Sequence, residues 1–319
     1  MYSSSRSAGS MPARRISNWI PARIAPEASC NWRMDFNKVY GGPVQISGGH
    51  NFWDTTWTLD AGEAFTTPKM VFGFTEEGSD GMADCMHRYI RKHVLPTNFQ
   101  EKHRPVLYNS WYSTGFGVTE ENQIGLAKVA KDLGVELFVI DDGWFKGSTK
   151  DSTGLGDWTI DKERFPKGLK NLIKTINDMG MDFGIWVEPE MVNPDSDLYR
   201  AHPDWVFHYP KRERLTARNQ MMLNLAREDV YEYLLKSLDD LLSENNITFV
   251  KWDCNRSVSE PGWPDAPREL QREVRIRFVE NLHRLLAELR KRHPNVMFEN
   301  CASGGGRIDM GMMAYTDQN

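Results

Sequence analysis

Cysteine is scarce in this sequence, with four among 319 residues and no two of them in a Cys-x-x-Cys pair. That spacing argues against a zinc site and against thiol redox chemistry, and it favours the reducing cytosol as the compartment. No run approaches eighteen apolar residues, which excludes a helix that spans a membrane. Residues 1–26 are basic and rich in serine but contain no apolar stretch of the kind found in a secretory signal. We therefore expect a cytoplasmic protein without a membrane partner.

An excess of positive charge is also missing, because 39 lysines and arginines face 44 aspartates and glutamates, for a net charge of −5. The basic residues are scattered, so there is no basic face of the kind that binds nucleic acid. None of the eight histidines stands in an HExxH or HxH motif, so no metal site is expected. Aromatic residues, in contrast, are plentiful, with 11 Trp, 10 Tyr and 15 Phe. Aromatic rings stack on the apolar faces of ligands, and carbohydrate is one such ligand.

The chain before residue 105 contains two segments of different pattern. Residues 1–34 carry many Ser, Pro and Arg without a period and are interpreted as an irregular lead-in. Between 39 and 77, the alternating runs VQISG, NFWDTTWTL and KMVFGFT predict antiparallel strands, and apolar positions at helical spacing predict a helix over 80–94. Residues 35–95 are therefore expected to form part of a β-domain together with a linking helix.

After residue 105, five short apolar segments alternate with amphipathic helical stretches, which predicts a parallel sheet in an α/β fold. Each expected strand ends in polar or aromatic residues, and the carboxyl ends of the strands form the active-site face of a (β/α)8 barrel. A doubly wound sheet is the alternative, but no GxGxxG loop follows the first strand. A TIM barrel over 105–319 is therefore favoured. The expected strands are 106–111, 137–142, 183–188, 249–253 and 296–301.

Carboxylates at strand ends, without histidine clusters, indicate metal-free chemistry, of which glycoside hydrolysis is the leading case. Asp253 ends an apolar strand, and alternation places Lys251 on the same side, where its charge favours an ionised carboxylate. The same pattern also fits an aspartate that caps the next helix. Asp141 and Asp142 are adjacent, and the turn at Gly143 lets both reach a ligand, although a plain polar turn fits them equally well.

The remaining candidates for ligand binding rest on weaker patterns. Trp111 and Trp186 stand at strand ends beside polar or acidic residues, which favours stacking on a sugar over core packing. Arg218 carries no signal beyond that of a surface arginine. The glycine-rich run after Cys301 lets the backbone approach a ligand closely, although most such runs are plain turns.

Several segments, in order, strongly resemble the catalytic barrel of the family 36 glycoside hydrolases, the α-galactosidases or melibiases. They are VLYNSW, LFVIDDGWF, GLGDWTIDKERFPKGL, FGIWVEPEMVNPDSDLY, HPDWV, RNQMMLNL, VKWDCNR and ENCASGGGRIDMGM. The resemblance runs from about residue 105 to the last residue. Residues 39–95 resemble, more weakly, the end of the antiparallel β-sandwich that precedes the barrel in that family, and 1–34 resemble nothing recognised. The implied fold is a (β/α)8 barrel of which about five βα units lie in this chain.

The resemblance implies a retaining α-galactosidase that removes terminal α-linked galactose from oligosaccharides of the melibiose and raffinose type, without a cofactor. Asp253 falls on the family's nucleophile, which forms a covalent glycosyl-enzyme. Further positions fall on the family's sugar-binding residues: Asp141 and Asp142 at the galactose hydroxyls, Lys251 and Arg218 at other sugar contacts, Trp111 and Trp186 as aromatic walls, and Cys301 and Ser303 near the 2-hydroxyl.

The sequence departs from the family pattern at its end. The family's general acid/base is an aspartate in a Trp-x-Ser-Asp-Asn-Thr-Asp motif at the end of the sixth strand, and this chain ends at Asn319, before that motif. We therefore expect a fragment that lacks the proton donor and is inactive by itself. Alternatives left open are an α-N-acetylgalactosaminidase, a transglycosidase similar to raffinose synthase, and a galactose-binding fragment without activity. A homo-oligomer of the full-length form is also left open.

Overall fold

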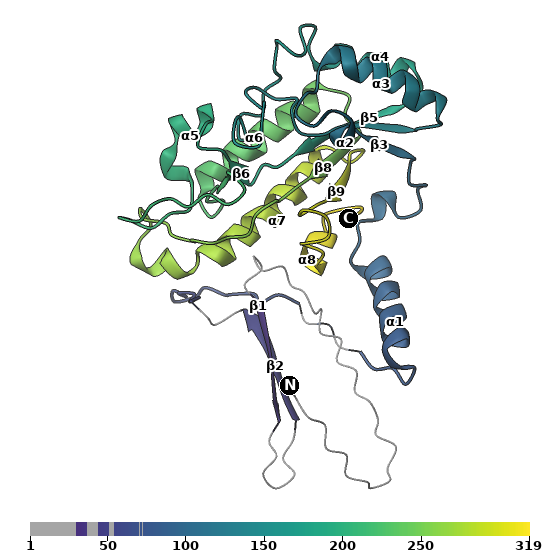
Figure 1. The fold of residues 1–319 in the computed structure, drawn as a ribbon. Coiled ribbons are helices and arrows are strands. Elements are labelled where there is room, and N and C mark those ends of the chain that lie inside the picture. Colours follow the sequence, from purple (N-terminus) through teal and green to yellow (C-terminus); the bar gives the residue numbers. More distant parts are fainter. Residues whose placement is uncertain (1–29, 37–43, 51–53, 70, 72) are drawn as a thin grey trace, which may run out of the picture.

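The computed structural model describes residues 30–36, 44–50, 54–69, 71 and 73–319 (Figure 1). Residues 1–29 of the expected irregular lead-in lie outside the described residues, and the expectation is wrong for 30–34, which are paired in a strand. The first two strands, β1 (Cys30–Phe36) and β2 (Val44–His50), form an antiparallel pair in which Cys30 stands opposite His50. The β-sandwich around this pair stays a prediction.

The strands expected over 51–59 and 69–75 do not form among the residues described there, which adopt turns and extended chain without strand pairing. A strand needs a hydrogen-bonded neighbour. This part of the chain bonds instead to a distant helix start, because the Thr58 N–H donates to the Glu273 carboxylate over 2.8 Å. The prediction of strands in this segment is therefore wrong for its described residues.

The linking helix expected over 80–94 is confirmed as α1 (Gly78–His93). The short turn η3 (Thr97–Phe99) follows it, and Phe99 packs in one cluster with buried residues of the central sheet, which is described next.

Five parallel strands form the central sheet, and their order in the sheet is their order in the chain (Figure 1). A doubly wound sheet would reverse its order at a switch point, whereas a barrel wall adds each strand beside the last. The expected α/β fold with part of a (β/α)8 barrel is confirmed. The strands are β3 (Leu107–Asn109), β4 (Leu137–Ile140), β5 (Asp182–Val187), β8 (Phe249–Trp252) and β9 (Met297–Asn300).

Four long helices cover the outer face of the sheet: α3 (Glu120–Asp132), α4 (Leu169–Asp178), α6 (Glu228–Glu244) and α7 (Val274–Arg292). Their apolar residues recur at helical spacing, as in α4, where Leu169, Leu172, Ile173 and Ile176 are buried. Helices α6 and α7 lie side by side along the sheet (Figure 1). No helix in the described part of the chain combines the length and the apolar character needed to cross a membrane.

Short elements shape the loops at the carboxyl ends of the strands. They include the antiparallel pair β6 (Met191–Val192) and β7 (Met221–Met222), which joins the two ends of the long connection between β5 and α6. The others are α2 (Trp111–Thr114), α5 (Asp197–Ala201), η4 (Pro203–Trp205), η5 (Arg268–Arg272) and α8 (Met310–Met313).

Strand alternation divides the core into an inner and an outer cluster. The inner cluster consists of Phe99, Leu137, Val139, Phe249 and Met297. Gly184 lies among them because an added Cβ would come within 2.9 Å of side-chain atoms of Phe249 and Val139. The intervening residues Phe138 and Ile140 belong to the outer cluster between sheet and helices. Side chains in register with Val139 and Phe249 therefore point into the barrel.

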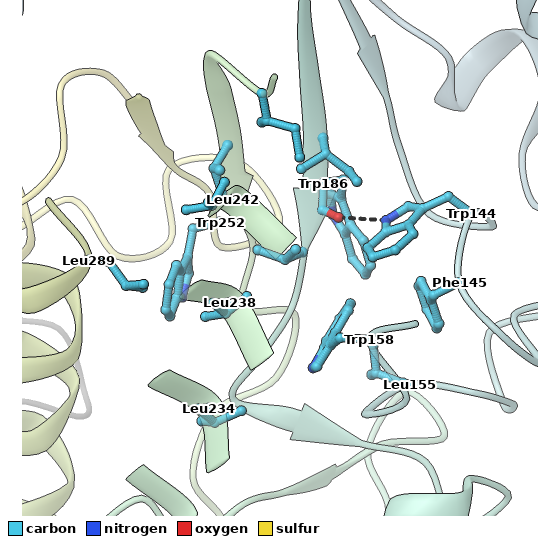
Figure 2. Close-up of a cluster of buried hydrophobic side chains, with 14 of the residues drawn as sticks. Trp144, Phe145, Leu155, Trp158, Trp186, Leu234, Leu238, Leu242, Trp252 and Leu289 are labelled. Atoms are coloured by element: carbon cyan, nitrogen blue, oxygen red, sulfur yellow. Dashed lines mark hydrogen bonds between the residues drawn. The ribbon is translucent and has the colours of Figure 1, made fainter. Parts of the chain in front are cut away.

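Leucines of the helices contribute to the outer cluster, and a group of aromatic rings lies at the end of β5. Figure 2 shows Trp144, Trp158 and Trp186 close together, with the Trp144 indole N–H donating to the Trp186 carbonyl over 2.9 Å. The Phe145 and Trp186 rings lie parallel, with centroids 6.3 Å apart. This packing fixes the end of β5, where the sheet meets its carboxyl-end loops.

Candidate active site

The inward register of the strands places polar side chains at one end of the barrel. Lys251 and Asp253 continue the inward series that begins at Phe249, and Asp141 continues that of Val139. Trp186 pairs in register with Lys251 across β5 and β8. Strand alternation therefore brings these side chains together at one end of the barrel, although they lie far apart in the chain.

These residues line a pocket of about 190 Å³ at the carboxyl ends of the strands. The structure brings all the residues that sequence reasoning selected into this one pocket. They are Trp111, Asp141, Asp142, Trp186, Arg218, Lys251, Asp253, Cys301 and Ser303.

A buried ion pair forms the floor of the pocket. The Lys251 ammonium lies 2.8 Å from Asp141 Oδ2, and the side chain of Asp141 is only 5% exposed. Asn109 donates to the same oxygen over 2.6 Å, and Ser110 Oγ accepts from the Asp141 N–H. Burial lowers the pKa of Lys251, but the charge and hydrogen bond of Asp141 together with the charge of Asp253 outweigh it, so the pKa is raised overall and the lysine stays charged.

Asp253 is buried but surrounded by hydrogen-bond donors. The Trp186 indole N–H donates to Oδ2 over 3.1 Å, and the Cys254 and Ser303 backbone N–H groups donate to Oδ1 over 2.9 and 3.4 Å. Burial raises the pKa of Asp253, whereas the donors, which include Asn255 and Cys301, and the charge of Lys251 lower it below its ordinary value. Asp253 is therefore ionised at neutral pH.

Glu188, at the end of β5, is the neighbouring carboxyl and behaves in the opposite way. It is 1% exposed, and burial followed by the charge of Asp253 raises its pKa to about 8. Its oxygens accept from the Asn255 N–H and from Gln220 Nε2. At neutral pH Glu188 therefore keeps its proton while Asp253 is charged, and such a divergence of pKa separates the roles of paired carboxyls.

Asp142 lies just beyond the last residue of β4, where the turn at Gly143 has a φ of 106°. Its Oδ1 accepts from Ser148 Oγ over 2.7 Å. Burial raises the pKa of Asp142 to about 7, despite the hydrogen bond from Ser148. The turn thus brings two adjacent aspartates to the same pocket, as expected.

The two tryptophans occupy different surroundings. Trp186 is 2% exposed, so its ring belongs to the aromatic cluster of Figure 2 while its indole N–H reaches Asp253. Trp111 is half-buried at the start of α2 and meets the Phe116 ring edge-on, with centroids 5.1 Å apart. Trp111 offers more of its face to a ligand than Trp186 does.

Three loop residues complete the selected set. Arg218 and Ser303 have left-handed backbones, with φ values of 54° and 49°, and Arg218 donates to Ser303 Oγ over 3.4 Å. Burial and the negative charge of Asp253 raise the pKa of the Cys301 thiol to about 11, so it remains a hydrogen-bond donor. Non-glycine residues in this region of φ cluster at functional sites.

The pocket also contains residues that sequence reasoning did not select. The position of polar residues after the strands could have selected Glu188 and Asn255. Glu188 directly follows β5, and Asn255 follows Asp253 by two residues. The loop residues carried no local signal, because chain segments distant from one another bring them together. The additional lining residues are Phe116, Phe145, Lys150, Asp151, Thr153, Leu155, Glu188, Asn193, Gln220, Asn255 and Gly304.

The described residues contain no group of three or more His, Cys, Asp or Glu side chains that could hold a metal ion. The pocket is lined by the carboxyl groups of Asp141, Asp142, Asp151, Glu188 and Asp253 and by the cationic side chains of Lys150, Lys251 and Arg218. Such a pocket offers hydrogen-bond acceptors and donors to a polyhydroxylated ligand beside one reactive carboxylate.

A half-barrel with a carboxylate pocket at its strand ends is the arrangement of a barrel glycoside hydrolase. The Melibiase family model matches residues 64–319, and the chain belongs to this family. α-Galactosidase AgaA of Geobacillus stearothermophilus is 43% identical over 277 residues, which cover 87% of this chain and 38% of the relative. α-Galactosidase 1 of Pediococcus pentosaceus is 38% identical over 295 residues, which cover 89% of this chain and 40% of the relative.

Solved structures give the same result. The crystal structure of the family 36 α-galactosidase AgaA superposes with a TM-score of 0.86 at 39% identity and covers 93% of this chain and 43% of that chain. A variant of that enzyme in complex with raffinose superposes equally well, also with a TM-score of 0.86 at 39% identity and the same coverage. This chain thus spans about two fifths of the length of the curated relatives that it matches.

Proposed function

We propose that this chain carries the nucleophile and the sugar-binding residues of a retaining α-galactosidase. The substrate is a terminal α-linked galactose of melibiose- or raffinose-type oligosaccharides. The observation that supports this most strongly is the placement of Asp253 at the end of β8, where three N–H donors orient its carboxylate inside the pocket. The relatives named α-galactosidases and the raffinose complex of one of them support the choice of substrate.

Asp253 is the proposed nucleophile. Its carboxylate attacks the anomeric carbon, and the bond from that carbon to the leaving oxygen breaks, so that a covalent galactosyl ester forms. Water then attacks the same carbon on the face opposite the ester and gives a proton to the group that protonated the leaving oxygen. The bond from this carbon to Asp253 breaks, and galactose leaves with net retention of configuration. The donors from Trp186, Cys254 and Ser303 hold the carboxylate in one orientation before the attack.

The remaining charged groups are proposed to recognise the sugar. Asp141 and Asp142 accept hydrogen bonds from galactose hydroxyls, and Lys251 and Arg218 donate to them. The pair between Lys251 and Asp141 leaves the ammonium with further protons for a ligand. A pocket of about 190 Å³ suits a single sugar ring, which fits the removal of one terminal residue.

The proton donor for the leaving oxygen is proposed to come from another part of the enzyme. Among the described pocket residues, Glu188 is the protonated carboxyl, but it is 1% exposed and both its oxygens accept hydrogen bonds. It therefore cannot reach a leaving group above the sugar.

The proposal is tested with two measurements on the same preparation. Calorimetry is expected to show binding of galactose and weaker binding of glucose. Hydrolysis is measured with an aryl α-galactoside whose leaving group needs little protonation, because the missing donor then matters least. Asp253→Asn is expected to abolish this hydrolysis, whereas Asp240→Asn, a change at an exposed ion pair of α6, retains it. Equal affinity for both sugars, or unchanged hydrolysis by Asp253→Asn, would overturn the proposal.

A further inference from the structure

Arg218 is the first central residue of a tight two-residue turn whose backbone conformation is unfavourable for an arginine. Ala217 and Gln220 exchange two backbone hydrogen bonds, each of 3.1 Å, around Arg218 and Asn219. Both central residues have left-handed backbones, with φ values of 54° and 58°. Such turns prefer Asn or Gly at both central positions, and an arginine in the first of them conflicts with that preference. Some other contact must hold the turn in this conformation.

Asn193 supplies such a contact from the loop that follows β6. Asn193 is 1% exposed, and its side chain bonds to three backbone groups in two segments. Nδ2 donates to the Asn219 carbonyl over 2.9 Å and to the Asp151 carbonyl over 3.1 Å, and Oδ1 accepts from the Leu155 N–H over 2.9 Å. One amide therefore joins the Arg218 turn to the loop that follows β4.

A second hydrogen bond, on the solvent side, also links the Arg218 turn to the loop that follows β4. Asn219 Nδ2 donates to Asp151 Oδ2 over 3.0 Å, so the two loops are linked once through a buried amide and once directly. Asp151 and Leu155 line the pocket, as Arg218 does. The position of the guanidinium therefore depends on contacts outside its own turn.

We propose that Asn193 is a positioning residue that holds Arg218 in the pocket through the Asn219 carbonyl. Its primary amide suits this role because it offers two donors and one acceptor to three backbone groups at once. The inference rests on the proposed function, since the consequence of the positioning is tighter binding of galactose. The Asn193 side chain acts on the sugar through the turn and not by chemistry of its own.

The test compares Asn193→Asp with a control that also weakens the fold. The aspartate keeps the size and the acceptor but loses the two donated hydrogen bonds. Thr119→Ala removes the hydrogen-bonded cap of α3, away from the two loops. Asn193→Asp is expected to speed amide hydrogen exchange over 217–220 and to weaken galactose binding on the order of tenfold. Thr119→Ala is expected to lower the unfolding midpoint without either effect.

A double-mutant cycle separates positioning from a general structural role. If Asn193 acts through Arg218, then Asn193→Asp weakens galactose binding in the parent chain and adds little in an Arg218→Ala background. Additive losses would overturn the proposal. Should Asn193→Asp fail to fold, Asn193→Ser takes its place, because it removes the same two donated hydrogen bonds without burying a charge. Unchanged hydrogen exchange over 217–220 in that variant would also contradict the inference.

The two proposals fail in different ways. Absence of galactose binding in the parent chain would contradict the proposed function, while the exchange rates over 217–220 would still test the role of Asn193. Galactose binding in the parent chain together with equal binding by Asn193→Asp would contradict the positioning role alone.

Discussion

Replacing Glu188 by glutamine is expected to stabilise the protein, and to do so increasingly as the pH rises. The glutamine resembles the protonated carboxyl that Glu188 carries in the folded state, where its pKa is about 8 against an ordinary value of 4.5. The amide oxygen can still accept from the Asn255 N–H. Its new N–H can donate to Oε1 of Gln220, a buried atom without a hydrogen-bond partner among the described residues, once the Gln220 amide turns over.

The size of the effect follows from proton linkage. Below pH 4.5 the carboxyl is protonated in both the folded and the unfolded chain, and it contributes no pH dependence. Between 4.5 and about 8 the unfolded chain loses this proton while the folded chain keeps it, so the free energy of unfolding falls as the pH rises. At 1.36 kcal/mol per pKa unit, the loss by pH 8 is on the order of 4 kcal/mol.

Urea unfolding followed by tryptophan fluorescence at several pH values from 5 to 8.5 measures this difference. Glu188→Gln is expected to gain on the parent chain throughout that range, with a plateau above pH 8. Glu228→Gln serves as the control, because the pKa of this surface glutamate is lowered by its hydrogen bond to Arg284. Its stability relative to the parent should not rise over the same range. Parallel curves for Glu188→Gln and the parent would refute the reasoning.

Two further predictions concern the pocket. At pH 8, above the pKa of about 7 of Asp142, Asp142→Ala is expected to weaken galactose binding by about 1.5 to 3 kcal/mol and glucose binding by less, because a charged acceptor for a hydroxyl is lost. Calorimetry with both sugars checks this, and equal losses would make Asp142 structural. Cys301 is expected to alkylate slowly at pH 8, since its pKa is raised to about 11 by burial and by Asp253. Mass spectrometry with iodoacetamide should find faster labelling in Asp253→Asn, and an unchanged rate would contradict the role of that charge.

Much of the site was predictable because it rests on strand alternation. Lys251 and Asp253 share the inward face with Phe249, and polar residues at the ends of parallel strands meet at one edge of the sheet. A local pattern of period two is therefore enough to select them. Arg218 was different, since only the family resemblance selected it and its pattern was that of a surface arginine.

The parts that were not predictable depend on contacts between distant segments. The proton on Glu188 depends on burial, on Asp253 and on groups that later loops bring to it, none of which is visible near residue 188. Asn193 gains its significance from bonds to Asp151, Leu155 and Asn219. The strands expected over 51–59 and 69–75 failed for a related reason, because alternation predicts a strand without showing that a partner strand exists.

The central claim, that Asp253 is the nucleophile, is tested most directly by trapping the galactosyl-enzyme. An aryl α-galactoside with a good leaving group can load the carboxylate without a proton donor, whereas release of the ester by water benefits from a general base. Intact-mass spectrometry after rapid acid quenching is expected to show one added galactosyl group, and peptide mapping should place it on Asp253 and find none in Asp253→Asn. An adduct on Glu188 or another residue, or hydrolysis that inverts the anomeric configuration, would contradict the claim.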